Sequence, residues 1–262
     1  MSTRAFYDTY WPRNVPDAAR TAEHVRGIVP PGRFRRALDA GCGTGVCSLA
    51  LAERSEYVLG LDLSLGSLRT AAEVFGGTLC NASLLDLPLR SDSFDLVFCW
   101  GVIHHTSDPA RALDELVRVL EPGGMLILAV YLRTWLTPLH ELARWVCVRL
   151  PGAWRPLVVR GLASLVRARV RLSPLTTTRD DNPLIESQVE DWFFVPDKHF
   201  FSVDQLAQLF AERGLTFELL DPHTGRFRSS SNFVARGRSM GTRDGAAGAA
   251  AVFARATGYP LT

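Results

Sequence analysis

The sequence predicts an α/β protein built on a doubly wound sheet of seven strands, mostly parallel, with an antiparallel strand near the C-terminus and a helical insert. Between residues 35 and 131, short apolar runs alternate with patterns of helical spacing. These apolar runs are continuous, as expected of parallel strands that are buried on both faces. A glycine-rich loop joins the first apolar run to the first helical pattern.

The individual elements of this region follow from its apolar runs and its helix breakers. The chain of 262 residues is long enough for one sizeable domain with an elaboration. The breaker Pro122-Gly123-Gly124 separates the last helix from the last strand. The expected strands are Ala37–Asp39, Tyr57–Leu61, Gly77–Asn81, Phe94–Trp100 and Met125–Tyr131, and the expected helices are Val46–Arg54, Ser67–Phe75 and Pro109–Leu120.

The pattern changes after the last of these strands. Helical spacing continues over residues 132–182, where prolines are expected to cut it into short pieces at Pro138, Pro151, Pro156 and Pro174. The run Ser202–Gln205 resembles a capping box, which predicts a helix that continues to Arg213. Two antiparallel strands are expected after this helix, at Thr216–Leu220 and Ser231–Ala235.

Composition narrows the function classes. The net charge of +2 gives no support for nucleic-acid binding. No apolar stretch approaches the ~20 residues that span a bilayer. The first 20 residues carry Asp8 and Asp17 and lack an apolar run, which does not fit a signal peptide. We therefore expect a cytoplasmic protein. Neither a disulfide scaffold nor a metal site is expected, because the cysteines are odd in number and form no C-x-x-C pair: Cys42, Cys47, Cys80, Cys99 and Cys147.

The glycine-rich loop has the spacing Asp39-x-Gly41-x-Gly43-x-Gly45. Glycines let a backbone turn sharply and approach a ligand without a Cβ clash. The helix that follows presents unpaired N–H groups and a positive dipole end to an anionic group. A dinucleotide-binding loop has the spacing G-x-G-x-x-G, whereas these glycines alternate and Val46 follows the third. The loop therefore predicts a bound ligand but argues against NAD.

Further blocks follow this loop along the chain. Asp62 ends the second strand 17 residues after Gly45, where an acid can accept hydrogen bonds from both ribose hydroxyls. Then come Leu87-Pro88, Phe94–Val97 and Glu115–Gly124. In this order and spacing the blocks resemble the class I S-adenosylmethionine-dependent methyltransferases, in the small-molecule, methyltransferase type 11-like subgroup with its Rossmann-like sheet. The resemblance is close over residues 30–131 and looser over 190–236.

The resemblance implies that the chain binds S-adenosylmethionine and releases S-adenosylhomocysteine. In that family the glycine loop faces the methionine part of the cofactor, and the acid after the second strand holds the ribose. Residues before the fourth strand frame the adenine. Carried over by position, the expected cofactor-binding residues are Asp39, Gly41, Cys42, Gly43, Gly45, Asp62, Leu63, Ser83, Leu84 and Trp100, with Tyr7 from the amino-terminal segment.

Ser83 departs from the family pattern. The family usually has Asp at this position, four residues before the Leu-Pro pair, to accept a hydrogen bond from the adenine amino group. A serine hydroxyl accepts without charge assistance, so weaker capture of the adenine is expected. Asp86, close by in the sequence, is an alternative acceptor.

Candidates for catalysis follow from the reaction that the resemblance implies. Methyl transfer is an in-line displacement at a sulfonium, in which proximity and alignment lower much of the barrier. A base is needed only when the acceptor must lose a proton. His199 is the first candidate, ahead of His104 and His105, which follow the fourth strand at the sheet edge where ligands collect. The alternative is that these histidines are structural.

Aromatic and basic side chains gather in the segments outside the sheet. Phe6, Tyr7, Tyr10 and Trp11 are expected to form a lid strip over the cofactor or an aromatic anchor. Residues 131–179 contain nine arginines and one acid, Glu141. They predict a cover for a lipophilic or acidic acceptor, peripheral contact of residues 132–179 with an anionic membrane, or a cap with solvated arginines. The expected substrate-binding residues are Tyr131, Arg133, Trp135, Asp191, Trp192 and Phe200.

These patterns lead to one expected function with two alternatives. We expect methylation of oxygen, nitrogen or carbon in a small, hydrophobic metabolite, of the kind met in secondary metabolism. The alternatives are a quinone or lipid acceptor at a membrane, and a regulatory protein that binds the cofactor without catalysis. Both a monomer and a homodimer fit the sequence. The expected organisation is a helical lid segment (1–34), the cofactor-binding core (35–131), the substrate-cover insert (132–182), the completion of the core sheet (183–237) and a flexible tail (238–262).

Overall fold

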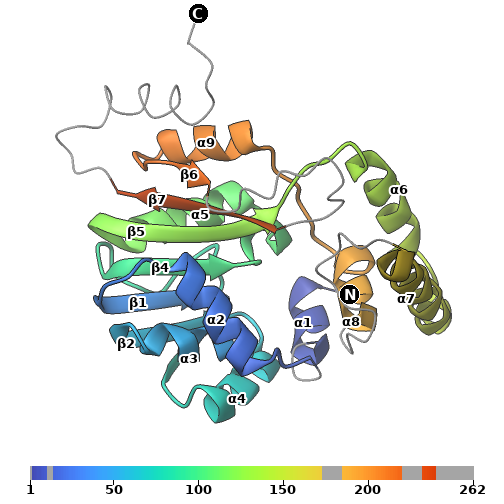
Figure 1. Cartoon of the computed structure of the whole chain (residues 1–262), viewed down its shortest axis with the longest axis horizontal. Coiled ribbons are helices and arrows are strands. Elements are labelled where there is room, and N and C mark those ends of the chain that lie inside the picture. Colours follow the sequence, from blue (N-terminus) through green and yellow to red (C-terminus); the bar gives the residue numbers. More distant parts are fainter. Residues whose placement is uncertain (1, 11–13, 173–184, 220–231, 240–262) are drawn as a thin grey trace, which may run out of the picture.

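Seven strands form one sheet in the order β3-β2-β1-β4-β5-β7-β6, with helices on both faces (Figure 1). The computed structural model describes residues 2–10, 14–172, 185–219 and 232–239. Strand β7 pairs antiparallel with β5 and β6, and the other strand pairs are parallel, which confirms the predicted fold class. The strands are β1 (Phe34–Ala40), β2 (Ser55–Asp62), β3 (Thr78–Asn81), β4 (Phe94–Trp100), β5 (Leu120–Tyr131), β6 (Glu218–Leu219) and β7 (Asn232–Arg238).

The helices cover the two faces of the sheet and the edge where the parallel strands end. Helices α2 and α3 pack on one face, and α5 and α9 pack on the other. Helices α1, α6, α7 and α8 share a smaller apolar cluster of their own, on the right of Figure 1. The helices are α1 (Thr3–Tyr10), α2 (Ala18–Ile28), α3 (Val46–Ala52), α4 (Leu65–Val74), η2 (Ile103–His105), α5 (Pro109–Val119), α6 (Thr137–Cys147), η3 (Gly152–Trp154), α7 (Arg155–Leu172), α8 (Ile185–Phe193) and α9 (Val203–Ala211).

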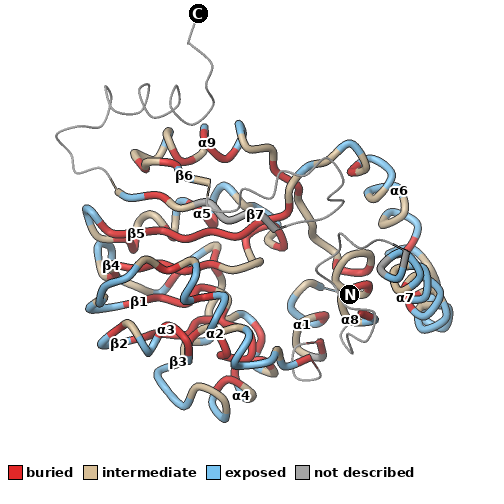
Figure 2. Tube along the Cα trace, in the orientation of Figure 1, coloured by how far each residue is buried: buried red, intermediate tan, exposed pale blue. Residues whose placement is uncertain are grey.

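The core explains why the strand sequences are continuously apolar. Along β4, Leu96 and Phe98 face α2 and α3, whereas Val97 and Cys99 face α5 and α9. All four side chains are fully buried. Figure 2 shows the same buried run along β1, β4 and β5. Because both faces are covered by helices, no polar alternation is needed along these strands.

Side-chain caps fix where several helices begin. Ser64 and Asp108 accept hydrogen bonds from the backbone N–H groups at the starts of α4 and α5. The predicted capping box is confirmed: the Ser202 hydroxyl accepts from the Gln205 N–H at 3.2 Å, and the Gln205 side chain accepts from the Ser202 N–H at 3.0 Å. Each cap satisfies backbone donors that have no partner within the helix.

The ends of several elements differ from those expected. Strand β5 begins at Leu120, before the breaker Pro122-Gly123-Gly124, and its register with β4 shifts between Phe94 and Leu96 to accommodate the breaker. Strand β6 is shorter than the expected Thr216–Leu220. Trp11, Leu220, Ser231 and the tail from residue 240 lie outside the described residues.

The insert contains longer helices than expected. Helix α7 spans 18 residues and α6 spans 11. Pro138 and Pro156 lie in the first turns of α6 and α7, where the missing N–H has no helical partner to lose, so they start these helices instead of cutting them. Pro174 lies outside the described residues. Among the helices that the structure describes, none is long and apolar enough to cross a membrane.

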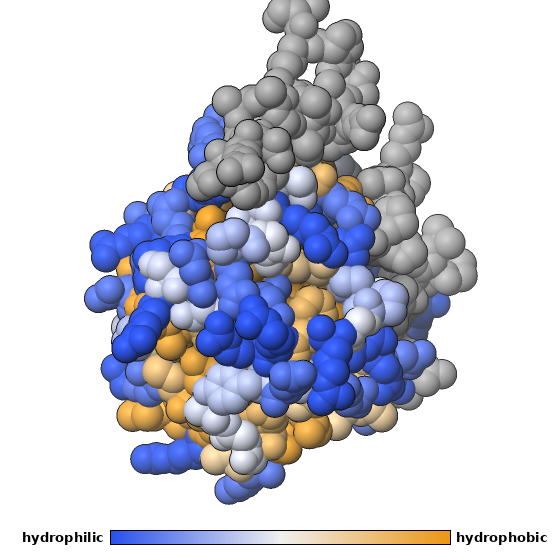
Figure 3. Space-filling view, turned by 90° about the vertical axis from the view of Figure 1, so that its left-hand side faces the viewer, coloured by the Kyte–Doolittle hydropathy of each residue, from blue (hydrophilic) through white to orange (hydrophobic). Residues whose placement is uncertain are grey.

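The opposite end of the sheet, where the parallel strands begin, has a charged surface. Arg35 and Arg36 form ion pairs with Glu121 at 2.5 and 2.8 Å. Figure 3 shows that hydrophilic side chains cover much of this end, with smaller apolar areas between them. This end of the sheet therefore presents a largely polar surface.

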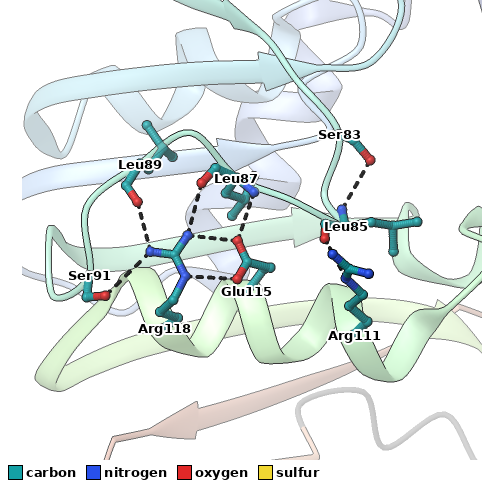
Figure 4. A network of polar contacts seen from close by, with 8 residues as sticks. All are labelled: Ser83, Leu85, Leu87, Leu89, Ser91, Arg111, Glu115 and Arg118. Atoms are coloured by element: carbon teal, nitrogen blue, oxygen red, sulfur yellow. Dashed lines mark hydrogen bonds and ion pairs between the residues drawn. The ribbon is translucent and has the colours of Figure 1, made fainter.

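A polar network holds the loop between β3 and β4 on helix α5 (Figure 4). The Glu115 carboxylate accepts from the Leu87 N–H at 2.8 Å and from the Arg118 guanidinium at 2.7 and 2.8 Å. Arg118 also donates to the carbonyl oxygens of Leu87 and Leu89. The bond to Arg118 lowers the pKa of Glu115. The network fixes the loop that carries Ser83.

Glu115→Ala is expected to lower the free energy of unfolding by about 1–3 kcal/mol, because it leaves the Leu87 N–H and the Arg118 guanidinium without their shared acceptor. Urea denaturation measures this loss. Glu53→Ala is the matched control, since Glu53 pairs with Arg26 through side chains that are nearly half exposed, and it should cost less than about 0.5 kcal/mol. Equal losses in the two variants would contradict the proposed role of the network.

Candidate functional site

The glycine loop turns at the carboxyl end of β1 in a conformation that requires glycine. Gly41 has a φ of +84°, and a Cβ there would lie 2.4 Å from the Val102 side chain. The N–H groups of Gly41 and Cys42 donate to the Leu61 carbonyl at 2.7 and 2.9 Å. The loop is therefore held between the end of β2 and the segment after β4, and Gly41 lines the space beyond it.

Two carboxylates support this loop, Asp39 buried and Asp62 partly buried. Asp62 accepts from the Gly43 N–H at 2.9 Å and from the Ser64 N–H at 2.8 Å. Asp39 accepts from the Ser48 hydroxyl at 2.6 Å. Burial raises the pKa of Asp62, and it raises the pKa of Asp39 to about 7. Asp62 thus holds the glycine loop through the backbone N–H of Gly43. Asp39 joins the end of β1 to α3 on the side of the loop away from the cavity.

A cavity of about 630 Å³ begins at this loop and extends to helices α1 and α8. Asp62 ends β2 and Gly41 follows β1, on one side of β4, whereas Tyr131 ends β5 on the other side of β4 and is bonded to Asp191. These two pairs of residues mark the two ends of the cavity. Seven of the predicted cofactor-binding residues line it, namely Tyr7, Gly41, Asp62, Leu63, Ser83, Leu84 and Trp100. Cys42, Gly43 and Gly45 lie in the loop itself and, like Asp39, do not line the cavity.

The end of the cavity near Ser83 departs from the expected charge pattern. The Ser83 hydroxyl accepts from the Leu85 N–H at 3.2 Å (Figure 4), so it keeps its own hydrogen and one further lone pair for a ligand. Asp86 is exposed and does not line the cavity. The structure thus places the neutral hydroxyl of Ser83 at this end of the cavity, and the Asp86 carboxylate, the alternative acceptor, does not reach it.

The other end of the cavity is organised around Asp191. Its Oδ1 accepts from the Tyr7 hydroxyl at 2.9 Å, and its Oδ2 accepts from the Tyr131 hydroxyl at 2.7 Å. Burial tends to raise the pKa of Asp191, but the basic groups His105 and Lys198 and the two hydroxyls outweigh it, so the net shift is downward. Asp191 therefore stays ionised at neutral pH and joins α8 to α1 and β5.

His105 is the predicted catalytic histidine that the structure places in the cavity. Its Nδ1 lies 3.0 Å from the Asp197 carbonyl oxygen. Because a carbonyl can only accept, Nδ1 carries the hydrogen and Nε2 carries the lone pair. Nε2 lies 3.7 Å from Asp191 Oδ1. Burial lowers the pKa of His105 to about 4, so the ring is neutral at pH 7.

The other two candidate histidines lie behind the cavity wall. The ring Nε2 of His199 lies 3.1 Å from the Thr106 carbonyl oxygen, and the backbone N–H of His199 donates to the His104 carbonyl at 2.8 Å. His104 is fully buried against Tyr131, and neither ring nitrogen has a partner among the described residues. The structure therefore favours His105 over His199, the first candidate from the sequence, for contact with a substrate.

Helix α1 covers the cavity and is fastened on both sides. The Thr3 hydroxyl donates to the Asp197 carboxylate at 2.6 Å, and the Gly66 N–H at the start of α4 donates to Asp8 at 3.3 Å. Tyr7 faces the cavity, whereas Phe6 is buried in the cluster with α7 and α8. The aromatic residues of α1 thus serve as both a cover and an anchor, because one side of the helix faces the cavity and the other side packs in the apolar cluster.

Half of the six predicted substrate-binding residues line the cavity, and half do not. Those that line it are Tyr131, Asp191 and Trp192. Phe200 packs behind Tyr131 with ring centroids 6.0 Å apart, and Trp135 is 79% exposed. These two residues do not line the cavity, nor do Arg133 and the other described arginines of the insert. The charged residues that line it are Arg4, Asp62, Asp191 and Asp197, so the structure does not support an acidic acceptor held by the insert.

Lys198 also belongs to this region, although in the sequence it stands out only as the single lysine. Its Nζ lies 3.9 Å from the centroid of the Tyr131 ring and donates to the backbone carbonyl of Asp191 at 3.3 Å. Burial lowers the pKa of Lys198 to about 7. In the sequence, the one feature that could have pointed to Lys198 is that it is the single lysine beside 28 arginines. The two residues differ when buried, because the pKa of Lys shifts readily and that of Arg stays high.

Comparisons with known proteins agree with this geometry. A family model described as a methyltransferase domain matches residues 38–128. A demethylmenaquinone methyltransferase of Clavibacter sepedonicus is 36% identical over 107 residues, which is 39% of this chain and 44% of that protein. A tRNA U34 carboxymethyltransferase of Hahella chejuensis is 36% identical over 152 residues, 52% of this chain and 44% of that protein. The chain thus spans less than half the length of these two relatives.

A further relative and a solved structure extend the comparison. An uncharacterised methyltransferase of Mycobacterium tuberculosis is 31% identical over 152 residues, 50% of this chain and 75% of that protein. The N-methyltransferase NodS of Bradyrhizobium japonicum, solved with S-adenosylhomocysteine, shares the fold with a TM-score of 0.55, at 14% identity over 91% of this chain and 99% of that chain. Fold and site thus define a methyltransferase of the Rossmann-like type. The chain belongs to the class I S-adenosylmethionine-dependent methyltransferases.

A pH titration of stability tests the burial of the histidines. His140 on α6 lies tilted against the Phe193 ring and edge-on to the Phe200 ring, and burial lowers its pKa to about 4. Unfolded histidine takes up a proton near pH 6.5, so folding stability is full above that pH and falls as the pH drops from about 6.5 toward 4. His140→Phe removes one such group, and its melting temperature should fall less between pH 7 and pH 5 than that of the unaltered protein. An equal fall in both would contradict the burial.

Proposed function

We propose that this chain transfers the methyl group of S-adenosylmethionine to a small, largely apolar molecule bound at the Tyr131 and Asp191 end of the cavity. The single observation that carries this is the continuous cavity that joins the glycine loop and Asp62 to that end. Bound S-adenosylmethionine supplies an electrophilic methyl group on a sulfonium. The chain contributes chiefly by holding the acceptor close and aligned in a space from which α1 excludes water.

The residues at the loop end fit the cofactor part by part. Gly41 lines the cavity, and its close approach to Val102 allows no Cβ; the loop backbone at this position suits the methionine portion. The Asp62 carboxylate has lone pairs left for ribose hydroxyls after its two backbone bonds. Ser83 and Leu84 line the adenine end, where a neutral hydroxyl predicts modest affinity.

A small acceptor suits the closed shape of the cavity and the charge of the residues that line it. Helix α1 is tied down across the cavity through Thr3, Tyr7 and Asp8. The carboxylates in the lining outnumber the single arginine, Arg4, which disfavours a phosphate-bearing acceptor such as a nucleic acid. The five cysteines are free thiols, which supports the expected cytoplasmic address. A metabolite of secondary metabolism is the kind of acceptor that we propose.

A metabolite extract separates an enzyme from a protein that only binds the cofactor. The chain is incubated with the extract and S-adenosylmethionine carrying a deuterated methyl group, and mass spectrometry detects labelled products. We expect at least one labelled small molecule that is absent when the chain is omitted. Binding of the cofactor without any labelled product would favour a non-catalytic regulatory protein instead.

Asp62→Ala is expected to weaken S-adenosylhomocysteine binding at least tenfold, because the ribose loses charge-assisted hydrogen bonds worth about 1.5–3 kcal/mol. Isothermal titration calorimetry measures the dissociation constant. Asp114→Ala is the control, since Asp114 forms an exposed ion pair with Arg213 outside the cavity. Unchanged affinity in Asp62→Ala would refute the ribose assignment.

A second candidate is a lipophilic acceptor of the quinone or lipid class, reached at an anionic membrane surface. Helices α6 and α7 form an outer layer of the molecule with much exposed surface (Figure 2). Arg149 stacks on Trp145 at 4.3 Å, so cationic and aromatic groups share this surface. A curated relative is named as a demethylmenaquinone methyltransferase. The exposed apolar residues of this surface include Trp135, Leu139, Leu142, Trp145, Trp154, Leu157 and Leu165.

Co-sedimentation with lipid vesicles tests the membrane candidate. The chain should bind vesicles of anionic phosphatidylglycerol more tightly than vesicles of phosphatidylcholine. The double variant Leu142→Ser/Trp145→Ser should bind them at least tenfold more weakly, because it removes apolar area from the contact. Leu49→Ser, which removes an exposed leucine from α3, is the matched control. Equal, negligible binding to both vesicles would end this candidate, and self-association through α6 would assign the surface to a homodimer.

A further inference from the structure

Two hydrogen-bond acceptors face each other across the acceptor end of the cavity. Asp191 Oδ1 and His105 Nε2 lie 3.7 Å apart. The hydrogen of His105 is on Nδ1, where it is donated to the Asp197 carbonyl. A carboxylate offers about four lone-pair positions, and the hydroxyls of Tyr7 and Tyr131 use two of them. Both atoms therefore have lone pairs available to accept hydrogen bonds from a bound molecule.

Asp191 also has little positive charge in direct contact. Among the described residues, no Lys or Arg nitrogen lies within 4.0 Å of its carboxylate oxygens, and the basic atom inside that limit is His105 Nε2. Lys198 donates to the backbone carbonyl of Asp191 instead of its carboxylate. Buried carboxylates are costly unless they are paired, so a cationic ligand in the cavity would stabilise this one.

Aromatic rings surround the same position. The His105 ring lies edge-on to the rings of Tyr7 and Tyr131, with centroids 5.7 Å away in each case. Tyr10 and Trp192 also line the cavity. Aromatic faces attract cations, and they lie beside a carboxylate whose side chain is only 14% exposed. The chemistry that fits this end is an organic cation with two or more hydrogens on one atom.

We propose that the methyl acceptor is a primary or secondary amine whose nitrogen binds between Asp191 and His105; this inference rests on the proposed function. An ammonium ion donates one hydrogen to Asp191 Oδ1 and one to His105 Nε2, whereas a hydroxyl has a single hydrogen and satisfies only one of them. A carboxylate has no hydrogen to give and is repelled. The site thus selects the acceptor by its number of donors and by its charge.

The ammonium ion must lose a proton before it can react, and that proton goes to His105 Nε2. Burial disfavours a charged His105, but Asp191 at 3.7 Å raises the pKa of the ring against burial and stabilises the imidazolium that forms. The departure of the proton frees the nitrogen lone pair. As the nitrogen–methyl bond replaces the sulfur–methyl bond, the positive charge of the sulfonium passes to the methylated nitrogen beside Asp191. His105 then releases its proton to solvent, so one proton leaves for each methyl transferred.

Binding of three matched probes tests the proposal without any turnover. Benzylamine, benzyl alcohol and benzoate place an ammonium, a hydroxyl and a carboxylate on the same ring. Each is titrated calorimetrically into the protein saturated with S-adenosylhomocysteine. We expect benzylamine to bind at least tenfold more tightly than benzyl alcohol and benzoate not to bind. Asp191→Asn should remove that preference, whereas Asp114→Asn, an exposed substitution outside the cavity, should keep it.

The outcomes separate this proposal from the proposed function. If S-adenosylhomocysteine binds normally and benzyl alcohol or benzoate binds as tightly as benzylamine, the amine proposal is refuted and methyl transfer stands. The same holds if Asp191→Asn binds S-adenosylhomocysteine normally and keeps the preference for benzylamine. If the unaltered protein does not bind S-adenosylhomocysteine at all, the proposed function itself is refuted. Where Asp191→Asn does not fold, the probe series on the unaltered protein still supports or refutes the amine proposal.

Discussion

The reversal of strand order between β1 and β4 is the constraint on which the site depends. From β1 the chain moves outward to β2 and β3, and then returns to β4 on the other side of β1. Right-handed crossovers put the connecting helices on opposite faces, which leaves a crevice where the carboxyl ends of β1 and β4 diverge. Gly41 and Val102 meet in this crevice at a distance that only glycine allows. The cavity opens there because the topology leaves the space and the loop does not fill it.

Asp191 ties the cover to this core. Residues far apart in the sequence converge on its carboxylate: Tyr7 from α1, His105 from η2 and Tyr131 from β5. The amino-terminal helix and α8 are thereby held over the carboxyl edge of the sheet, as Figure 1 shows. One carboxylate thus positions helix α1 and shapes this end of the cavity, so an acceptor bound as we propose would act directly on the contacts that hold α1 in place.

Much of the fold could be predicted from the sequence, because its signals are local. The apolar run of β4, the capping box at Ser202 and the glycines of the loop each carry their meaning within a few residues. The acceptor end could not be predicted in the same way. The sequence ranks His199 ahead of His105 as a base, whereas the structure places His105 in the cavity lining and His199 outside it. Their positions depend on which carbonyl oxygens their rings reach, those of Asp197 and Thr106 respectively. Such contacts between distant segments leave no local pattern.

The central claim is that one cavity joins a cofactor end at Asp62 to an acceptor end at Asp191. A crystal structure of the protein with S-adenosylhomocysteine tests it most directly. We expect the ribose hydroxyls on the Asp62 carboxylate, the adenine beside Ser83, and the sulfur facing the space between His105 and Asp191. Density for the ligand outside this cavity, or a sulfur turned away from His105 and Asp191, would contradict it.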